Sequence, residues 1–233
     1  MTLQLTGKSE PRGLYQDFSG RPMDIMPVLI EQGYDPASVD LIFDRRLNAP
    51  AEVIPAWRDY FFWTGDSAST DETGGAVLTL DSQPLRIEKE DEVELSQGAL
   101  QLTRDQFENL KTDYNSVTMS PEEVKDAQGR GVMKKGSLWL PVNESVGKAL
   151  GHYLRGKSFE DKSFQTYAQM VSDVSRGSKE VLQQYFDTSR PSQPHLRSLV
   201  VYGTGGNSDV IGCNDLILRY NNGFLIGVAQ KKE

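Results

Sequence analysis

The sequence is poor in the side chains that bind transition metals. It contains a single cysteine, Cys213, and two histidines, His152 and His195. One thiol cannot form an internal disulfide, which fits the reducing environment of the cytosol. A structural zinc site needs several Cys or His ligands, so this class of site is disfavoured. We therefore predict no metal site, and no motif in the chain indicates a bound cofactor.

Long apolar runs are also missing. The longest unbroken runs are residues 60–63 and 199–202, whereas a membrane-spanning helix needs about 20 apolar residues. Residues 1–20 carry charges without an apolar stretch between them, so a secretory signal is not expected. These absences predict a soluble, cytoplasmic protein without a membrane partner.

The chain also lacks a surplus of basic residues. The chain has 25 Lys and Arg against 33 Asp and Glu, which gives a formal net charge of −8. Broad binding to nucleic acid phosphates needs the opposite balance, so a nucleic acid partner is disfavoured. The acidic excess is densest at residues 88–94, which we interpret as a solvated loop or strand edge.

The sequence does contain enough apolar material for a folded core. Its 233 residues are 37% hydrophobic, with 21 Gly and 11 Pro. This composition excludes wholesale disorder and collagen-like repeats. The length predicts one large domain or two small ones.

The pattern of residues 24–63 predicts three short helices joined by tight turns. Asp24 can cap the first helix, and Gly33 can end it in the left-handed conformation. Apolar residues at helical spacing mark the other two helices: Val39, Ile42, Phe43 and Leu47, followed by Val53, Ile54, Trp57, Tyr60 and Phe61.

A change of character follows these helices. Residues 64–75 are rich in Gly, Ser, Thr and Asp without periodicity, so we predict a loop and a domain boundary there. The predicted units are an N-terminal extension over residues 1–22, a three-helix subdomain over residues 23–64 and an α+β domain over residues 76–233.

The rest of the chain alternates between strand and helix patterns. Capping boxes at Thr103 and Ser120 predict helix starts. The strongest strand signal is a terminal hairpin over residues 216–228, whose turn is Asn221-Asn222-Gly223. The other predicted strands cover residues 76–80, 85–88, 92–95, 99–102, 138–141 and 196–202, and further helices cover residues 143–156, 158–177 and 178–186. The predicted class is α+β, with a helical N-terminal part, a mixed centre with antiparallel strands and a C-terminal β-hairpin.

Residues 151–158, GHYLRGKS, match the phosphate-loop pattern G-x-x-x-x-G-K-[ST]. That chemistry would place Gly156, Lys157 and Ser158 around an anion. The pattern normally follows a buried strand, whereas residues 143–150 have helical spacing. We therefore expect the end of one helix and the start of the next, with phosphate binding as the alternative.

A second glycine-rich stretch, residues 203–208, follows a predicted strand. The backbone N–H groups of Gly205 and Gly206 could bind a phosphate there. The stretch departs from the dinucleotide-binding fingerprint, because Ser208 stands where a third glycine is needed and no helix pattern follows. We expect a strand connection, with a ligand loop as the alternative.

Leu29-Ile30-Glu31-Gln32-Gly33-Tyr34 and the two apolar helices after it resemble the three-helix module of the ubiquitin-associated domain type. In that family the first loop and the neighbouring helix ends form a protein-docking patch. The resemblance implies a partner surface that involves Gly33, Tyr34, Trp57 and Phe61.

Two other interpretations of these helices stay open. Residues 36–47 could enter a DNA groove as part of a helix-turn-helix, with support from Arg45 and Arg46. Aspartates 35, 40 and 44 would then face phosphate, which ranks this interpretation lower. The helices could also be a packing subdomain without a partner.

Taken as a set, the patterns favour a binding protein without a recognisable catalytic constellation. Its candidate partners are a protein at the N-terminal helices and a second copy at the edge of the terminal hairpin. Whether the chain is an enzyme stays open, because scattered residues can form a site that one sequence does not reveal. The alternative is a phosphate- or nucleotide-handling enzyme that uses residues 151–158 or 203–208.

Overall fold

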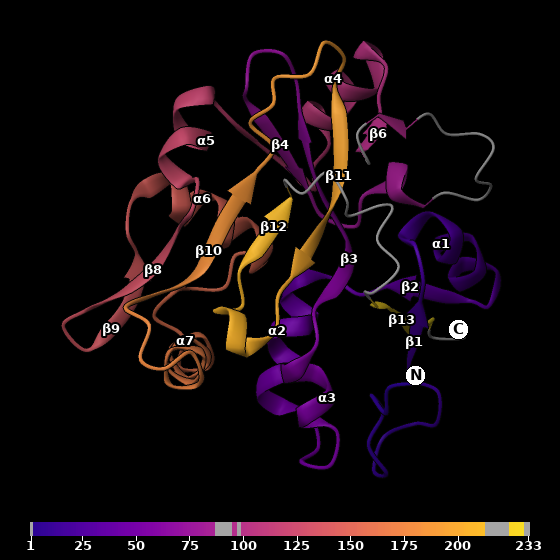
Figure 1. The fold of residues 1–233 in the computed structure, drawn as a ribbon, viewed down its shortest axis with the longest axis vertical. Coiled ribbons are helices and arrows are strands. Elements are labelled where there is room, and N and C mark those ends of the chain that lie inside the picture. The colour runs from indigo at the N-terminus through magenta and orange to yellow at the C-terminus, as the bar shows by residue number, and fades with distance from the viewer. Residues whose placement is uncertain (1, 87–94, 97–98, 213–223, 231–233) are drawn as a thin grey trace.

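The computed structural model describes residues 2–86, 95–96, 99–212 and 224–230 (Figure 1). In chain order the strands are β1 (Tyr15–Ser19), β2 (Tyr34–Pro36), β3 (Phe62–Thr70), β4 (Ala76–Thr79), β5 (Leu95–Ser96), β6 (Ala99–Gln101), β7 (Ser116–Met119), β8 (Arg130–Lys135), β9 (Leu138–Pro141), β10 (Glu180–Phe186), β11 (His195–Val201), β12 (Val210–Gly212) and β13 (Phe224–Ala229). The helices are α1 (Pro22–Glu31), α2 (Val39–Asn48), α3 (Ile54–Asp59), α4 (Arg104–Thr112), α5 (Pro121–Ala127), α6 (Glu144–Tyr153) and α7 (Lys162–Val174), with short 3-10 turns η1 (Gln83–Leu85) and η3 (Thr204–Gly206).

All of these strands belong to one mixed sheet. Its main path runs β1-β13-β3-β11-β12-β10-β8-β9, and the other strands attach at its sides. β2 pairs with β13, β4 lies between β3 and β7, and β6 joins β11 to β5. β1 pairs antiparallel with β13, so the two ends of the chain lie side by side (Figure 1).

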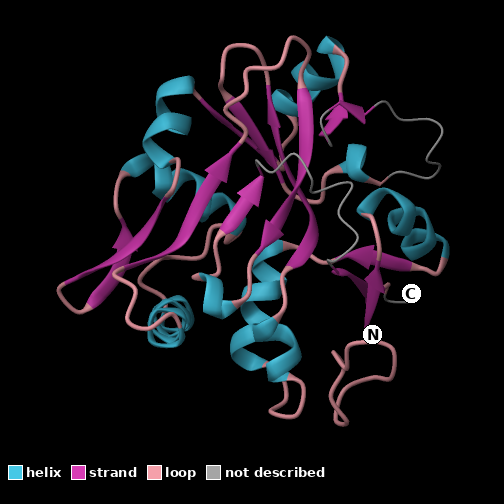
Figure 2. Cartoon of the chain, viewed as in Figure 1, coloured by secondary structure: helices cyan, strands magenta, loops and turns pink. Residues whose placement is uncertain are grey.

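The buried core consists of two clusters. The larger cluster joins the sheet to α2, α3, α5, α6 and α7, and the smaller one joins it to α1 and α4. Figure 2 shows these helices arranged around the sheet. Successive side chains of a strand point to opposite faces. On β11, Leu196 and Val200 accordingly belong to the smaller cluster, and Leu199 and Val201 to the larger one.

The α+β class is confirmed, but the helical N-terminal part is not. Strand β1 precedes α1 and β2 follows it, and both strands pair with β13. In addition, α1 packs in the smaller cluster, while α2 and α3 pack in the larger one. Gly33, with a φ of +79°, ends α1 as expected and leads directly into β2. The sequence pattern missed β2 because its 3 residues are too few to show a period.

The loop predicted for residues 64–75 is wrong over most of its length. Residues up to Thr70 belong to β3, which is buried throughout and lies between β13 and β11. Two of the small polar side chains on this central strand bond within the core. Ser67 Oγ donates to Ser82 Oγ over 2.8 Å, and Thr64 Oγ1 donates to the Leu199 carbonyl over 3.0 Å. Their burial costs little when each has a partner.

A second correction concerns residues 178–186, which form strand β10 instead of a helix. Val181, Leu182 and Phe186 are all buried. Apolar residues at positions 181, 182, 185 and 186 fit helical spacing, and over so short a length this pattern does not separate a helix from a buried strand. The preceding helix also begins later than expected, at Lys162 instead of Ser158.

The helix starts predicted from capping boxes are confirmed, but the cap predicted at Asp24 is wrong, because α1 begins at Pro22 and Asp24 lies within its first turn. Thr103 and Ser120 both form complete capping boxes, at α4 and α5. The strand at residues 196–202 is β11, and the second strand of the terminal hairpin is β13. The hairpin turn, Cys213 and the acidic run at residues 88–94 lie outside the described residues. No helix in the described ranges is long and apolar enough to cross a bilayer.

Candidate functional site

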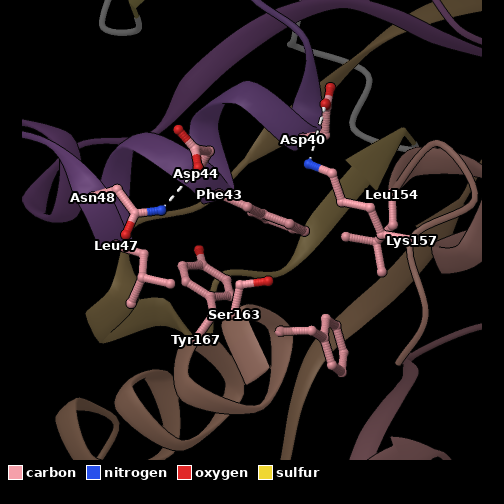
Figure 3. Close-up of a pocket in the computed structure, with 10 residues that line it drawn as sticks. Asp40, Phe43, Asp44, Leu47, Asn48, Leu154, Lys157, Ser163 and Tyr167 are labelled. Carbon is pink, nitrogen blue, oxygen red and sulfur yellow. Dashed lines mark hydrogen bonds and ion pairs between the residues drawn. The ribbon is translucent and has the colours of Figure 1, made fainter. Parts of the chain in front are cut away.

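A small cavity opens between α2 and α7, and we call it the α2–α7 groove (Figure 3). Its volume is about 50 Å³. One wall is the face of α2. The other wall is the connection between α6 and α7 together with the first turns of α7.

Aromatic rings form the floor of the groove. The ring centroids of Phe43 on α2 and Tyr167 on α7 are 4.8 Å apart, and Phe164 precedes Tyr167 by one turn. Side chains three or four residues apart share one face of a helix, which brings Phe43 beside Leu47 and Phe164 beside Tyr167. Each of the three aromatic residues is at most 5% exposed. The floor is therefore a fixed apolar surface.

Charged groups of both signs surround the mouth. Asp40, Asp44 and Asn48 follow one another at one-turn intervals on α2, and Asn48 Nδ2 donates to Asp44 Oδ1 over 2.8 Å. Lys157 extends from the opposite wall, with its Nζ 3.9 Å from Asp40 Oδ2. Figure 3 shows Asp44 and Asn48 on one side of the cavity and Lys157 on the other, with the aromatic floor between them.

The segment that carries Lys157 follows helix α6, as expected, and not a buried strand. Arg155 and Gly156 have left-handed φ angles of +51° and +76°. The Gly156 N–H donates to the Gly151 carbonyl over 3.2 Å. A left-handed residue of this kind is a common way to end a helix. The chain then continues toward α7 with the Arg155 and Lys157 side chains beside α2.

Arg155 joins this segment to two aspartates. Its Nε lies 3.0 Å from Asp40 Oδ1, and its second guanidinium nitrogen lies 2.9 Å from Asp81 Oδ2. Behind this pair, buried Asp66 accepts hydrogen bonds from the backbone N–H groups of Val39 (2.8 Å) and Asp81 (3.0 Å). Burial raises the pKa of Asp66 to about 6, against the effect of both hydrogen bonds. These contacts hold the first turn of α2 in place.

Tyr167 links the floor to the connection between β11 and β12. Its hydroxyl donates to Ser208 Oγ over 2.9 Å. Arg46, which is fully buried, donates from one guanidinium nitrogen to both Tyr167 and Ser208, at 3.3 and 3.2 Å. The same guanidinium also donates to the backbone carbonyls of Trp57, Tyr60 and Tyr202. One side chain thereby ties α2, α3, α7 and the end of β11 together.

The two glycine-rich stretches with phosphate binding as their alternative interpretation lie at opposite ends of α7. Residues 156–158 precede the helix. Gly205 and Gly206 belong to η3, where the Thr204 carbonyl accepts a hydrogen bond from Ser175 at the end of α7. A helix of 13 residues is about 20 Å long, so the structure does not bring the two stretches together.

The four residues predicted to bind a partner do not form one surface. Trp57 is fully buried in the larger cluster. Tyr34 and Phe61 pack against the smaller cluster, and the Phe61 ring stacks on Tyr202 with centroids 5.9 Å apart. Gly33 occupies the turn between α1 and β2. The burial of Trp57 separates it from any solvent-facing patch that contains the other three.

Arg45 and Arg46, which the helix-turn-helix interpretation placed near DNA, are both buried. Arg45 pairs with Glu10 at 2.6 Å, and Arg46 donates mainly to backbone carbonyls. Their charges are therefore engaged inside the protein. In the part of the chain that the structure describes, no group of three or more His, Cys, Asp or Glu side chains is placed to hold a metal ion.

Sequence reasoning missed the α2–α7 groove. The spacing of Asp40, Asp44 and Asn48 does show a polar stripe on α2, beside the apolar one. No local pattern reveals that Tyr167 and Lys157, far away in the chain, face this stripe. Contacts of this kind arise only from the packing of α2 against the region of α6 and α7.

The chain matches no known family profile and no curated protein. A solved structure described as "Accommodation of massive sequence variation in Nanoarchaeota by the C-type lectin fold" is similar, with a TM-score of 0.61 and 17% sequence identity. The similarity covers 92% of this chain and 96% of the other. The chain therefore has a C-type lectin fold, which is an α+β fold.

Proposed function

We propose that the chain is a binding protein that holds a small polar ligand in the α2–α7 groove. One observation carries this proposal: charged groups of both signs stand over a fixed aromatic floor around a cavity of about 50 Å³. Apolar walls with a few placed polar groups are typical of small-molecule sites.

The support beneath the groove favours binding as well. Arg46 fixes the Tyr167 side of the floor, and Arg155 fixes the segment of Lys157 against α2. A site whose walls are held before the ligand arrives loses less entropy on binding. The solved neighbour, described as accommodating massive sequence variation, supports a role of this fold as a constant scaffold for changing surfaces.

Phosphate handling is the second candidate, because Lys157 lines the groove. Asp40 and Asp44 line the same mouth and would repel a doubly charged phosphate. The arrangement therefore favours a ligand of small net charge.

A titration followed by amide NMR shifts tests the proposal. The ligand panel contains free amino acids, monosaccharides and nucleoside monophosphates at millimolar concentration. We expect at least one of these classes to shift the amides of α2 and of residues 154–164. The proposal is wrong when no member of the panel moves these amides.

Two tryptophan variants on α7 provide the matched control. Ser163 lines the groove, whereas Thr166 is exposed on the same helix outside it. Ser163→Trp should fill the cavity and remove the shifts, and Thr166→Trp should leave them unchanged. Shifts that persist in Ser163→Trp would place the binding elsewhere.

A further inference from the structure

We propose that the α2–α7 groove recognises the zwitterionic head group of a free amino acid, with the ligand ammonium at Asp44 and its carboxylate at Lys157. The inference rests on the proposed function of the groove and adds the chemical class of the ligand. Four features support it: the interactions of the Asp44 carboxylate, the interactions of the Lys157 ammonium, the size of the cavity and the apolar residues of its floor.

Asp44 supplies the negative charge. Its carboxylate accepts a hydrogen bond from the neutral Asn48 amide and forms no ion pair within the described ranges. Asp40 differs, because its Oδ1 already accepts hydrogen bonds from Ser38 Oγ at 2.6 Å and from Arg155 Nε at 3.0 Å. A carboxylate beside an apolar floor and without a cation suits a ligand ammonium, which can donate charge-assisted hydrogen bonds.

Lys157 supplies the positive charge. Its Nζ is 3.9 Å from Asp40 Oδ2, which is longer than a hydrogen bond, and its side chain is 52% exposed. No hydrogen bond holds this ammonium within the described part of the chain. Its donors can therefore turn to a ligand carboxylate. The alternative interpretation of the sequence placed an anion at the same lysine, and here the anion is the carboxylate of the zwitterion.

The size of the cavity fits a small head group. About 10–15 Å³ of such volume holds one water, so a cavity of about 50 Å³ has room for roughly four water-sized groups. Asp40 and Asp44 are one helical turn apart, and Lys157 lies beside Asp40. The span from Asp44 to Lys157 is thus of the order of one turn, which a short zwitterion can bridge.

The apolar floor and the balance of charges around the groove further restrict the chemical class of the ligand. Phe43, Tyr167 and Leu47 offer apolar surface to the side chain of the ligand, which favours an apolar amino acid. A zwitterion adds no net charge and gives both Asp44 and Lys157 a partner. A phosphate would satisfy Lys157 alone and would face Asp40 and Asp44.

Calorimetric titration with three related compounds tests this inference. L-Leucine carries both charges, L-leucinamide only the ammonium, and N-acetyl-L-leucine only the carboxylate. We expect leucine to bind about tenfold more tightly than either derivative, because each derivative loses one charged hydrogen bond. Asp44→Asn should remove the preference over N-acetyl-leucine and keep the preference over leucinamide. Lys157→Gln should remove the preference over leucinamide and keep the preference over N-acetyl-leucine. Asp173→Asn, an exposed change on α7 outside the groove, should leave both preferences unchanged.

The outcomes separate this inference from the proposed function. Equal binding of the three compounds, or binding of leucinamide alone, contradicts the recognition of a zwitterionic head group. The same holds when leucine fails to bind and a monosaccharide or nucleotide shifts the groove amides, although the proposed function then stands. When no compound of either panel affects the groove, both proposals are wrong.

Discussion

Gln165 on α7 makes both backbone hydrogen bonds that Trp139 on β9 would otherwise offer to another strand. The Trp139 N–H donates to Gln165 Oε1 over 2.7 Å, and Gln165 Nε2 donates to the Trp139 carbonyl over 2.8 Å. β9 ends the main path of the sheet. The side-chain amide therefore takes the place of a neighbouring strand, which protects an edge that could pair with another chain.

Removal of this amide should make the protein self-associate. In Gln165→Ala the Trp139 N–H and carbonyl face solvent on the sheet edge, and a second copy of β9 can satisfy them. We expect concentration-dependent dimers in sedimentation velocity and a loss of about 1–3 kcal/mol in the free energy of unfolding.

Gln169→Ala is the matched control for this edge. Gln169 lies one turn further along α7 and accepts from the Trp139 indole N–H at 3.2 Å and from Lys134 at 2.9 Å. Neither of these bonds involves the backbone of β9, so this variant should remain monomeric. Dimers in both variants, or in neither, would contradict the role of Gln165.

At the opposite end of the sheet, a side chain again makes both backbone hydrogen bonds of an edge residue. Thr6 Oγ1 donates to the Tyr15 carbonyl and accepts from the Tyr15 N–H, both at 3.0 Å. Tyr15 belongs to β1, the other end of the main path. The sequence left open whether the edge of the terminal hairpin self-associates. β13, the strand of that hairpin among the described residues, has β1 on one side and β3 and β2 on the other. An edge-to-edge dimer through β13 would therefore require these pairings to open.

Substitution of Arg46 should be the most damaging single change near the groove. Arg46→Met removes the donors to several buried acceptors at once, including the Trp57 carbonyl (2.8 Å) and the Tyr202 carbonyl (2.7 Å). Each buried carbonyl left without its donor costs about 1–3 kcal/mol, so the loss of several donors together should cost about 3–5 kcal/mol. Urea unfolding should show a decrease of this size.

Arg46→Lys separates charge from geometry. A lysine keeps the charge but lacks the planar fork that reaches several carbonyls in different directions. We expect Arg46→Lys to recover only a small part of the lost stability. A stability equal to that of the wild type would mean that charge alone matters at this position.

Local signals in the sequence were sufficient where one segment determines its own structure. The capping boxes at Thr103 and Ser120 bond only to residues three positions away, so their pattern predicted α4 and α5 correctly. The polar strand β3 could not be predicted in this way. Ser67 is acceptable in the core because Ser82, on another segment, accepts its hydrogen bond.

The candidate site depended even more on tertiary packing. The sequence drew attention to Lys157 through the phosphate-loop pattern. That pattern requires a buried strand before the loop, whereas helix α6 precedes Lys157 in the structure. Its relevant neighbours are Asp40, from a helix much earlier in the chain, and the rings of Phe43 and Tyr167. A single sequence contains no period that links these positions.

The partly buried Asp209 should lower stability at neutral pH. Burial and the nearby Glu180 raise its pKa to about 6, from a usual value near 4. The folded state thus binds this proton more tightly than the unfolded state, so the contribution of Asp209 to stability falls as pH rises from about 4 to about 6. Asp209→Asn removes this dependence and keeps the acceptor for the Gln183 N–H, which lies at 3.0 Å.

Urea unfolding of wild type and Asp209→Asn at pH 5 and pH 7 measures this effect. The variant should gain stability relative to wild type on going from pH 5 to pH 7, by an amount on the order of 1–2 kcal/mol. The comparison must be made at each pH, because burial lowers the pKa of His152 and His195 and their titration acts in the opposite direction. A pH-independent difference would show that Asp209 titrates normally in the folded protein.

Magnesium-bound nucleotides should not stabilise the protein through Lys157. A phosphate at this lysine would lie beside Asp40, whose Oδ2 is 3.9 Å from Nζ, and near Asp44 on the next turn of α2. In thermal unfolding with millimolar ATP·Mg and GTP·Mg we therefore expect a melting temperature within about 1 °C of that without ligand. A larger increase that Lys157→Ala abolishes would restore the phosphate-handling alternative, because only a ligand bound to the folded state raises the melting temperature. Asp40→Asn would then strengthen that binding, since it removes the carboxylate that competes with phosphate for the ammonium.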